Sequence, residues 1–392
     1  MNTNTNNNTG NTSLTFDSTS YTTGTANGVT YRAYSNITYV ASPVNASYQQ
    51  LSVYIPEAYI SGGTINGYTA STAPIFMANG SGGYMSGRIS TPSASNSEGK
   101  ALAKGYVVVS PAIRGRDVTN GTAPACIVDY KAAVRYIRYN ASNLPAGNVD
   151  RIISCGTSAG GAISSLLGAT GNSSDYDTWL SALGAADADD NIYMSICYCP
   201  ITNLDNADGA YEWTFGDDST ASTTLASQFI TYVNGLNLGY TLDADGTGTF
   251  ADYLESTGIS LSTYGATRDK TQIPAFDRLD LSSAENEEFG GKHFTDYSYS
   301  NSTAGGEMAD SSIIKAMNPM NYIGVTGVDT AQYWFIRHGM NDRDTSLAIP
   351  ALLALKLENA GCTVDFKAVS GQGHGGDYDI DDILSSIDAI LQ

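Results

Sequence analysis

Apolar runs alternate with helical segments along most of this chain. Strands are predicted at "YQQLSVYIP", "APIFMANG", "GYVVVSPAIRG", "RIISCG" and "NIYMSICYCP". Apolar and polar residues do not alternate cleanly within these runs, so both faces of the sheet are expected to be covered. Helices are predicted at "AGGAISSLLGA" and at "IVDYKAAVRYIRYNAS", where the apolar side chains fall on one face. Strands that alternate with helices indicate a mainly parallel sheet.

This alternation breaks between about residues 203 and 318, where scattered helices such as "LASQFITYVNGL" and "TFADYLESTG" lie among long polar loops. It resumes with "AQYWFIRHG", "LAIPALLALKLENAG", "CTVDFKAVSG" and "DIDDILSSIDAILQ". We therefore predict an α/β fold with a mostly parallel, doubly wound sheet and a large insertion after the sixth strand. Residues 28–202 and 319–392 are expected to form the core. Residues 203–318 are expected to lie over the ligand crevice of the sheet as a lid and substrate-binding insertion.

Residues 1–27 begin with "MNTNTNNNTGNTS" and are predicted to be a low-complexity leader, loosely attached or disordered. Such a leader is what a removed signal segment leaves behind, and it is also an ordinary disordered start. Together with a surface poor in Lys and Arg, it favours an extracellular or cell-surface location with the signal segment absent from this chain, and leaves a cytoplasmic one open. No apolar run reaches the ~18 residues of a membrane-spanning helix, so no membrane insertion is expected.

Charge narrows the classes of partner. The net charge is −20, and only 15% of the 392 residues are charged. A surface this acidic repels nucleic-acid phosphates, so nucleic acid is not an expected partner. The expected partner is a small neutral molecule, and the expected oligomeric state is a monomer.

The five cysteines are expected to be buried small apolar residues. Their number is odd and the chain is long, which does not indicate a disulfide framework. Cys197 and Cys199 are too close together for an ordinary zinc pair, and no second pair completes a site. No metal site is therefore predicted.

A candidate nucleophile lies in "CGTSAGG", where Gly156-Thr157-Ser158-Ala159-Gly160 separates a predicted strand from a predicted helix. This pattern is typical of a nucleophile elbow, in which glycines permit a tight turn that exposes the serine. The alternative is a structural turn in a chain rich in Gly and Ser. The strand before and the helix after it favour the catalytic interpretation.

A serine hydroxyl needs a base and an orienting acid. His374 follows the last predicted strand, which is where this kind of fold delivers its base. We expect His338 to be a structural hydrogen-bonding histidine and His293 to lie at the surface of the insertion. Asp342 in "RHGMNDRD" is the predicted acid. Asp344 would then be free for another role, and alternatively one of these two aspartates caps the next helix.

Two backbone N–H groups are expected to bind the oxyanion of an acyl transfer. One is that of Ala159, which follows the nucleophile. The other is expected from Ser81, or else from Gly80, in the glycine-rich loop after the third strand. The alternative for this loop is a turn with no catalytic role.

Seven segments resemble the bacterial tannases, α/β-hydrolases that cleave galloyl esters. They are "NGSGGYMSG", "PAIRGRD", "DYKAAVRYIR", "CGTSAGG", "PAFDRLDLSSAENEEFGG", "RHGMNDRDTSLAIP" and "GHGGDYD". The resemblance runs from about residue 30 through most of the chain and implies a Ser158–Asp342–His374 triad with no metal or organic cofactor. All three residues of this triad agree with those assigned from the residues alone.

The resemblance also implies the residues that bind the substrate ring. Its lysine, glutamate and aspartate for the gallate hydroxyls match Lys270, Glu285 and Asp344, and Ile201 matches a residue that packs against the ring. Ala284 stands where the family commonly has a proline, which weakens one apolar wall. The alternative is that Lys270 and Glu285 form a surface ion pair.

We therefore predict a serine esterase that hydrolyses galloyl esters through an acyl-enzyme and releases gallic acid. A feruloyl or other hydroxycinnamoyl esterase on the same scaffold is the alternative enzyme. A non-catalytic binding protein that keeps the α/β-hydrolase fold is the alternative from another class. Carboxylates that accept several phenolic hydroxyls favour the gallate prediction.

Overall fold

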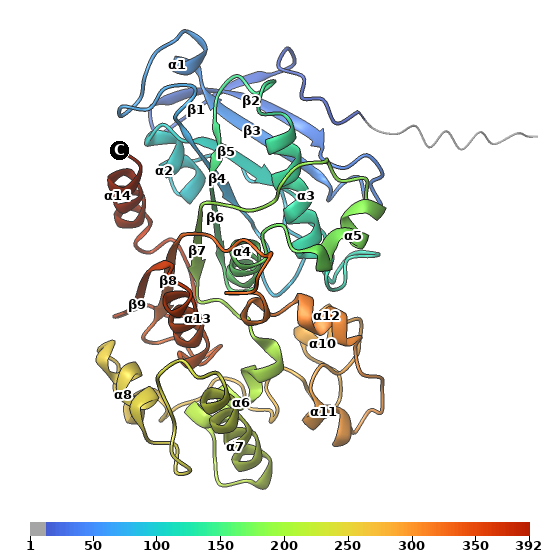
Figure 1. Cartoon of the computed structure of the whole chain (residues 1–392), viewed down its shortest axis with the longest axis vertical. Coiled ribbons are helices and arrows are strands. Elements are labelled where there is room, and N and C mark those ends of the chain that lie inside the picture. Colours follow the sequence, from blue (N-terminus) through green and yellow to red (C-terminus); the bar gives the residue numbers. More distant parts are fainter. Residues whose placement is uncertain (1–12) are drawn as a thin grey trace, which may run out of the picture.

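The computed structural model describes residues 13–392, which contain a nine-stranded sheet flanked by helices (Figure 1). The strand order is β1-β2-β3-β5-β4-β6-β7-β8-β9. The first three strands are antiparallel to their neighbours, and β5, β4, β6, β7, β8 and β9 are parallel. The strands are β1 (Thr22–Ala26), β2 (Val29–Thr38), β3 (Gln50–Pro56), β4 (Pro74–Ala78), β5 (Val107–Pro111), β6 (Asn148–Thr157), β7 (Met194–Tyr198), β8 (Tyr333–Gly339) and β9 (Thr363–Val369).

The central strands are covered on both faces. Every residue of β4, β5 and β7 is buried, which explains why their sequences are continuous apolar runs without alternation. Helix α4 packs against β6 and β7, and α3 packs on α4, while α2 contacts β4, β5 and α14. The core helices are α1 (Glu57–Ile60), α2 (Ser97–Ala103), α3 (Ala125–Tyr139), α4 (Ala159–Ala169), α5 (Asp177–Ala182), α13 (Ala348–Asn359) and α14 (Ile380–Leu391), with the 3-10 turn η1 (Ser174–Tyr176).

The predicted insertion lies between β7 and β8. Its helices gather at the lower end of the molecule in Figure 1, beyond the sheet. It follows the seventh strand rather than the sixth, because β1 adds a strand that the sequence analysis assigns to the leader. Its helices are α6 (Leu204–Phe215), α7 (Thr220–Gly235), α8 (Thr249–Ser256), α9 (Leu261–Tyr264), α10 (Ala284–Glu288), α11 (Asp296–Ser300) and α12 (Ser311–Ala316), with the 3-10 turn η2 (Pro319–Asn321).

Residues 13–27 are not the loosely attached leader that the sequence predicts. Phe16 is 4% exposed, its ring lies 5.0 Å from that of Tyr34, and its backbone N–H donates to Asn140 Oδ1 at 2.8 Å. β1 then pairs with β2 along the edge of the sheet. The prediction was wrong here because polar composition hides one aromatic anchor and one edge strand. Residues 1–12 of the predicted leader lie outside the described residues.

The five cysteines are free thiols, as the sequence predicts. Four are buried. Cys362 is only partly buried, and it lies in the short connection between α13 and β9, directly before the strand begins. No helix within residues 13–392 has both the length and the apolar content needed to cross a membrane.

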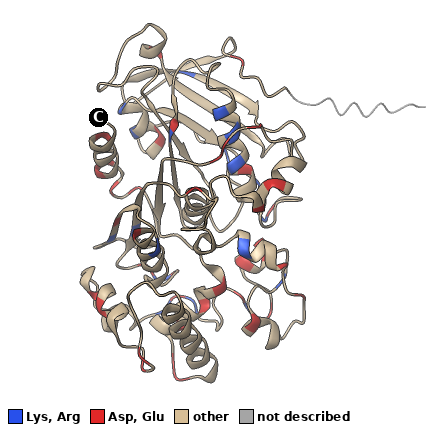
Figure 2. Cartoon of the chain, viewed as in Figure 1, with Lys and Arg blue, Asp and Glu red and all other residues tan. Residues whose placement is uncertain are grey.

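Acidic side chains are spread over both the sheet-bearing part and the insertion, whereas basic ones are fewer (Figure 2). Several of the basic side chains are held by buried carboxylates. Lys131 and Asp190 are both fully buried, and their charged atoms lie 2.7 Å apart. Arg114 and Asp129 form a two-bond pair in the same way. Because each of these buried pairs is neutral, the net charge of −20 falls on the other charged side chains of the protein.

The anchoring of Phe16 predicts the stability of a variant. Replacing Phe16 by Ala is expected to lower the free energy of unfolding by about 3 kcal/mol, because it leaves a cavity against Tyr34. Tyr139→Ala is the control, since Tyr139 is 51% exposed, and a change within about 0.5 kcal/mol is expected. Denaturant unfolding measures both, and equal stabilities for the two variants would contradict the anchoring.

Candidate active site

Ser158 lies at a sharp turn between β6 and α4. Its φ of 62° and ψ of −123° fall in the left-handed half of backbone space, which is unusual for a residue with a side chain. A Cβ on Gly156 would lie 2.2 Å from the carbonyl oxygen of Gly160, so only glycine fits there. The Ser158 backbone N–H donates to the carbonyl oxygen of Tyr198 on β7 at 2.9 Å. The elbow predicted from the sequence is therefore present and is held from two sides.

Three predicted side chains meet at the carboxyl ends of the parallel strands. The Ser158 hydroxyl lies 2.8 Å from His374 Nε2, and His374 Nδ1 lies 2.9 Å from Asp342 Oδ2. The serine follows β6, the aspartate follows β8 and the histidine follows β9. A Cβ on Gly339, the last residue of β8, would lie 2.3 Å from the carbonyl oxygen of Gly373. The glycine therefore lets the two loops approach closely enough for this hydrogen bond.

The surroundings favour an ionised Asp342. The aspartate is fully buried, and burial acts to raise its pKa, but the hydrogen bond from His374 and the nearby histidine charges outweigh burial and lower it. For His374, burial acts to lower the pKa, whereas the bond to Asp342 and the neighbouring Cys199 raise it above its usual value. The histidine is thus stabilised in its protonated form by the buried carboxylate.

Cys199 is a neighbour of this hydrogen-bonded set that the sequence analysis treats only as a buried apolar residue. Its φ is 43°, and one ligand atom each from Cys199, Asp342 and His374 lie within 4.8 Å of one another. The histidine and aspartate atoms already bond to each other and to Ser158. Cys199 therefore adds a thiol beside the hydrogen-bonded set of Ser158, His374 and Asp342.

The other two histidines are both buried. His338 Nε2 forms a hydrogen bond with the Tyr264 hydroxyl at 3.0 Å, as expected of a structural histidine. Burial lowers the pKa of His338 to about 4. The prediction that His293 lies at the surface is wrong. His293 is fully buried, with its Nδ1 2.8 Å from Asp277 Oδ1 and its Nε2 2.9 Å from the Ser302 hydroxyl. It organises the insertion, because Asp277 also accepts the backbone N–H of neighbouring residues.

The glycine-rich loop after β4 lies against the N-terminus of α4. The Asn79 side-chain amide donates to the carbonyl oxygen of Gly160 at 3.0 Å and to the Ser164 hydroxyl at 3.1 Å. The Ser81 backbone N–H reaches Asn79 Oδ1 only at 3.4 Å, a weak bond. Ser81 and Gly80 line the same cavity as Ser158. The sequence analysis names Asn79 only as part of a loop motif, and its amide is what joins that loop to the elbow helix.

The ring-binding candidates lie beside the predicted acid and base. Asp344 Oδ2 is 3.8 Å from His374 Nδ1, and Asp344 Oδ1 is 3.9 Å from Lys270 Nζ. Glu285, at the start of α10, is 7% exposed; burial raises its pKa, and the charge of Lys270 opposes that rise. Lys270 Nζ also lies 5.0 Å from the ring centre of Phe276. Lys270 and Glu285 do not form a surface ion pair, because Glu285 is buried.

Neither aspartate of the loop after β8 caps the next helix. Asp342 Oδ1 accepts the backbone N–H of Asp344 at 2.8 Å, while α13 begins at Ala348 without a side-chain cap.

Ile201 is 7% exposed, and its backbone N–H donates to the carbonyl oxygen of Ser158 at 3.2 Å. The hydroxyl of Tyr84, which no sequence signal singles out, donates to the carbonyl oxygen of Ile201 at 2.7 Å.

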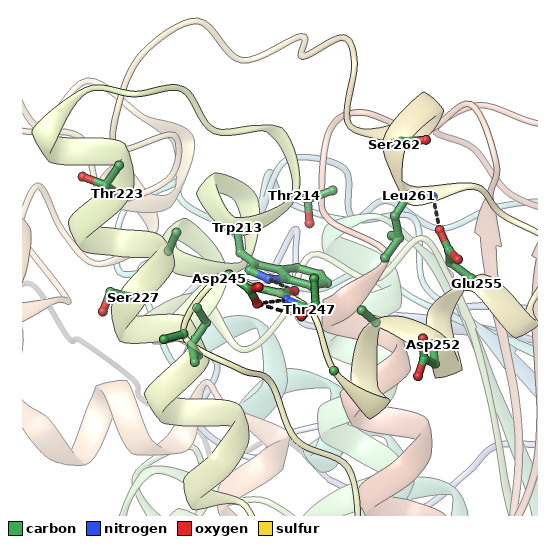
Figure 3. Close-up of a pocket in the computed structure, with 16 residues that line it drawn as sticks. Trp213, Thr214, Thr223, Ser227, Asp245, Thr247, Asp252, Glu255, Leu261 and Ser262 are labelled. Carbon is green, nitrogen blue, oxygen red and sulfur yellow. Dashed lines mark hydrogen bonds between the residues drawn. The ribbon is translucent and has the colours of Figure 1, made fainter.

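A larger cavity, of about 560 Å³, lies within the insertion. Trp213 on α6, Ser227 on α7 and the loop of Asp245 and Thr247 line it (Figure 3). None of the residues predicted for catalysis or ring binding lines this cavity. Ser158 opens instead on a smaller cavity of about 350 Å³. Size alone therefore does not identify the reactive site in this protein.

Comparisons with known proteins agree with this geometry. The family model BD-FAE matches residues 66–232. The chain is 38% identical to the tannase from Lactobacillus plantarum over 97% of this chain and 100% of that chain, with a TM-score of 0.91. It is 39% identical to Fusobacterium nucleatum tannase over 97% and 100% of the two chains, with a TM-score of 0.92. A tannin acyl hydrolase in complex with ethyl gallate is 40% identical over 97% and 99%, with a TM-score of 0.90. The comparison with curated proteins finds no match.

The mostly parallel sheet, the left-handed serine between strand and helix and the matching structures define an α/β-hydrolase. Its relatives are carboxylic ester hydrolases, and this chain is one as well. At 38% identity over nearly its whole length, the chain belongs to the tannase family.

The site geometry predicts how His374 and His338 titrate. His374 is expected to lose its proton above the ordinary value of about 6.5, whereas His338 is expected to stay neutral down to about pH 4. Asp342→Asn removes the carboxylate that raises the pKa of His374, so that pKa is expected to fall. NMR titration of the ring protons measures both pKa values. A His374 pKa at or below the ordinary value in the unmodified protein would contradict this geometry.

Proposed function

We propose that this tannase hydrolyses galloyl esters through an acyl-enzyme on Ser158. Related tannin acyl hydrolases have been captured with ethyl gallate and with 3,4-dihydroxybenzoate, which are phenolic ligands of this class. One observation carries the proposal: Asp344 lies within 4 Å of both His374 and Lys270, at 3.8 Å and 3.9 Å. Asp344, a carboxylate that can accept hydrogen bonds from phenolic hydroxyls, thereby lies next to His374, the base proposed to activate the nucleophile.

In the proposed reaction the Ser158 hydroxyl attacks the ester carbonyl while His374 Nε2 takes its proton. Asp342 holds the ring so that Nδ1 keeps its proton, and its charge stabilises the imidazolium that forms. The N–H groups of Ala159 and of Ser81 or Gly80 bind the oxyanion. The imidazolium then protonates the leaving alcohol. A water molecule, deprotonated by the same histidine, hydrolyses the acyl-enzyme and releases the aromatic acid.

The ring is proposed to lie between the insertion and the loop after β8. Glu285 and Asp344 accept hydrogen bonds from adjacent phenolic hydroxyls, and Lys270 donates to the oxygen lone pairs that remain. Ile201 packs against one face of the ring. The buried Glu285 is left unpaired by a ring without hydroxyls, and an unpaired buried polar group is costly. This recognition favours gallate over hydroxycinnamates that carry a methoxy group.

The remaining parts of the proposal follow from charge and architecture. Residues 203–318 act as the substrate-binding insertion of the core formed by residues 28–202 and 319–392. The reaction needs no metal or organic cofactor. The substrate is a small phenolic ester, and the surface charge disfavours nucleic acid. We also propose a monomer that acts outside the cell or at its surface, because the surface is poor in Lys and Arg; a cytoplasmic location is the alternative.

The nucleophile is tested by Ser158→Ala. Hydrolysis of methyl gallate is expected to fall by a factor on the order of 10⁴ or more, because the attacking oxygen is gone. Ser165→Ala is the matched control, since Ser165 lies on α4, the helix that follows Ser158, and its hydroxyl donates to the carbonyl oxygen of Ala162 within that helix at 2.7 Å. A fluorophosphonate probe is expected to label the unmodified protein and not the Ser158 variant. Equal labelling of both would rule out a serine mechanism at this position.

Glu285→Gln tests recognition of the ring. The kcat/KM for methyl gallate is expected to fall about tenfold, because a charged acceptor for a phenolic hydroxyl becomes neutral. The kcat/KM for methyl benzoate, which has no hydroxyls, is expected to stay within about twofold. Glu287→Gln is the control on the same helix, with a side chain that is 56% exposed.

The same assays distinguish the alternative enzyme. A preference of the unmodified protein for methyl ferulate over methyl gallate, or an equal effect of Glu285→Gln on all three esters, would favour a hydroxycinnamoyl esterase. The roles proposed for Glu285 and Asp344 would then be wrong.

A further inference from the structure

The cavity of about 350 Å³ at Ser158 lies apart from the residues proposed to bind the ring. The loop of Asn79–Gly82, the elbow residues up to Ser158, and three polar residues (Ser97, Glu98 and Asp377) line it. None of Lys270, Glu285, Asp344 or Ile201 lines it. The cavity therefore extends from the nucleophile in a direction that the ring-binding residues do not occupy.

An ester bound for attack has two halves, one on each side of the reacting carbon. If the aromatic acid occupies the insertion side, the alcohol must leave from the other side of Ser158. Thr157, which precedes the nucleophile, lines this cavity, so the cavity begins next to the reacting atoms. Its position fits the alcohol half of the ester.

Glu98 presents an acceptor to this cavity. It is 6% exposed, and its Oε2 accepts a hydrogen bond from the Ser97 hydroxyl at 3.3 Å. Within residues 13–392, no hydrogen bond reaches its Oε1. Asn96 caps the helix that carries it by accepting the Gly99 N–H at 3.0 Å. A Cβ on Gly99 would lie 1.7 Å from the carbonyl oxygen of Ser93, so the start of this helix is fixed by close packing.

Asp377 supplies a second acceptor from the loop that carries His374. Its φ of 60° places it in the left-handed region. Burial raises its pKa, and hydrogen bonds from the Ser97 hydroxyl and backbone N–H, which occupy part of its acceptor capacity, oppose that rise. A Cβ on Gly376 would lie 1.9 Å from the Thr157 hydroxyl, so this loop is in direct contact with the elbow. The cavity is thus built on the same two segments that hold the nucleophile and the base.

The charged residues that line the cavity are both acids, Glu98 and Asp377, and no Lys or Arg lines it. Carboxylates accept hydrogen bonds from hydroxyl groups and repel anions. We propose that this cavity is the leaving-group subsite and that it takes a neutral, hydroxyl-rich alcohol, with Glu98 and Asp377 as acceptors. The inference rests on the proposed function, because it assigns the half of the ester that the ring-binding residues leave unassigned.

Three galloyl esters that differ only in the alcohol test this subsite. The alcohol of methyl gallate carries no further hydroxyl group that Glu98 or Asp377 could accept a hydrogen bond from. A monogalloyl ester of glucose carries a neutral polyol, and a monogalloyl ester of quinic acid carries a polyol with a negative charge. For the unmodified protein, kcat/KM is expected to be highest for the glucose ester and lowest for the quinate ester.

Glu98→Gln and Asp377→Asn are the test variants. Each is expected to lower the ratio of kcat/KM between the glucose ester and methyl gallate by about tenfold and to raise the relative rate of the quinate ester. Asn is well tolerated at the left-handed position of Asp377. Asp382→Asn is the control, because it removes one exposed negative charge that does not line the cavity, and its ratios are expected to be unchanged. Thermal unfolding of all four proteins verifies that each is folded.

The outcomes separate this inference from the proposed function. Ratios that stay the same in both variants, in proteins that still hydrolyse methyl gallate, would overturn the leaving-group subsite alone. A quinate ester hydrolysed as fast as the glucose ester would overturn its charge selectivity. An unmodified protein that fails to hydrolyse methyl gallate would overturn the proposed function, and the subsite with it.

Discussion

The left-handed backbone of Ser158 is the constraint on which the rest of the site depends. A residue with a side chain in such a conformation costs on the order of 1–3 kcal/mol and persists only when its surroundings enforce it. Here the Ser158 N–H bonds to Tyr198 on the neighbouring strand, and its carbonyl oxygen accepts the N–H of Ile201. Gly156 and Gly160 leave no room for a Cβ. The sheet thus holds the hydroxyl above its carboxyl edge, where the loops after β8 and β9 deliver the acid and the base.

One short loop joins the reaction to recognition of the substrate. Asp342 is fully buried and bonds to His374, whereas Asp344 is nearly half exposed and lies between His374 and Lys270. In the proposed reaction, this one loop after β8 therefore supplies both the carboxylate that orients the base and the carboxylate that binds the ring. Tyr264 from the insertion bonds to the carbonyl oxygen of Thr345 in the same loop. This bond holds the insertion against the loop that carries Asp342.

Sequence reasoning predicts those features that depend on local pattern and chain order. The continuous apolar strands, the glycine-flanked Ser158 and the succession of serine, acid and histidine all follow from it. What it misses depends on contacts between distant segments. The edge strand β1 is polar, and the aromatic residues that anchor the segment before it, Phe16 and Tyr21, both pack against Tyr34. The burial of His293 needs Asp277 and Ser302 as partners, and the Asn79 amide has meaning only once α4 lies beside it.

A crystal structure of the Ser158→Ala protein with intact methyl gallate tests the central claim most directly. The account predicts that the ester carbonyl oxygen lies within hydrogen-bond distance of the Ala159 N–H and of a second N–H from the loop after β4. It also predicts that the three phenolic hydroxyls meet Glu285, Lys270 and Asp344. A ring bound away from these three side chains, in the cavity beside Glu98 or in the larger cavity of the insertion, would contradict it.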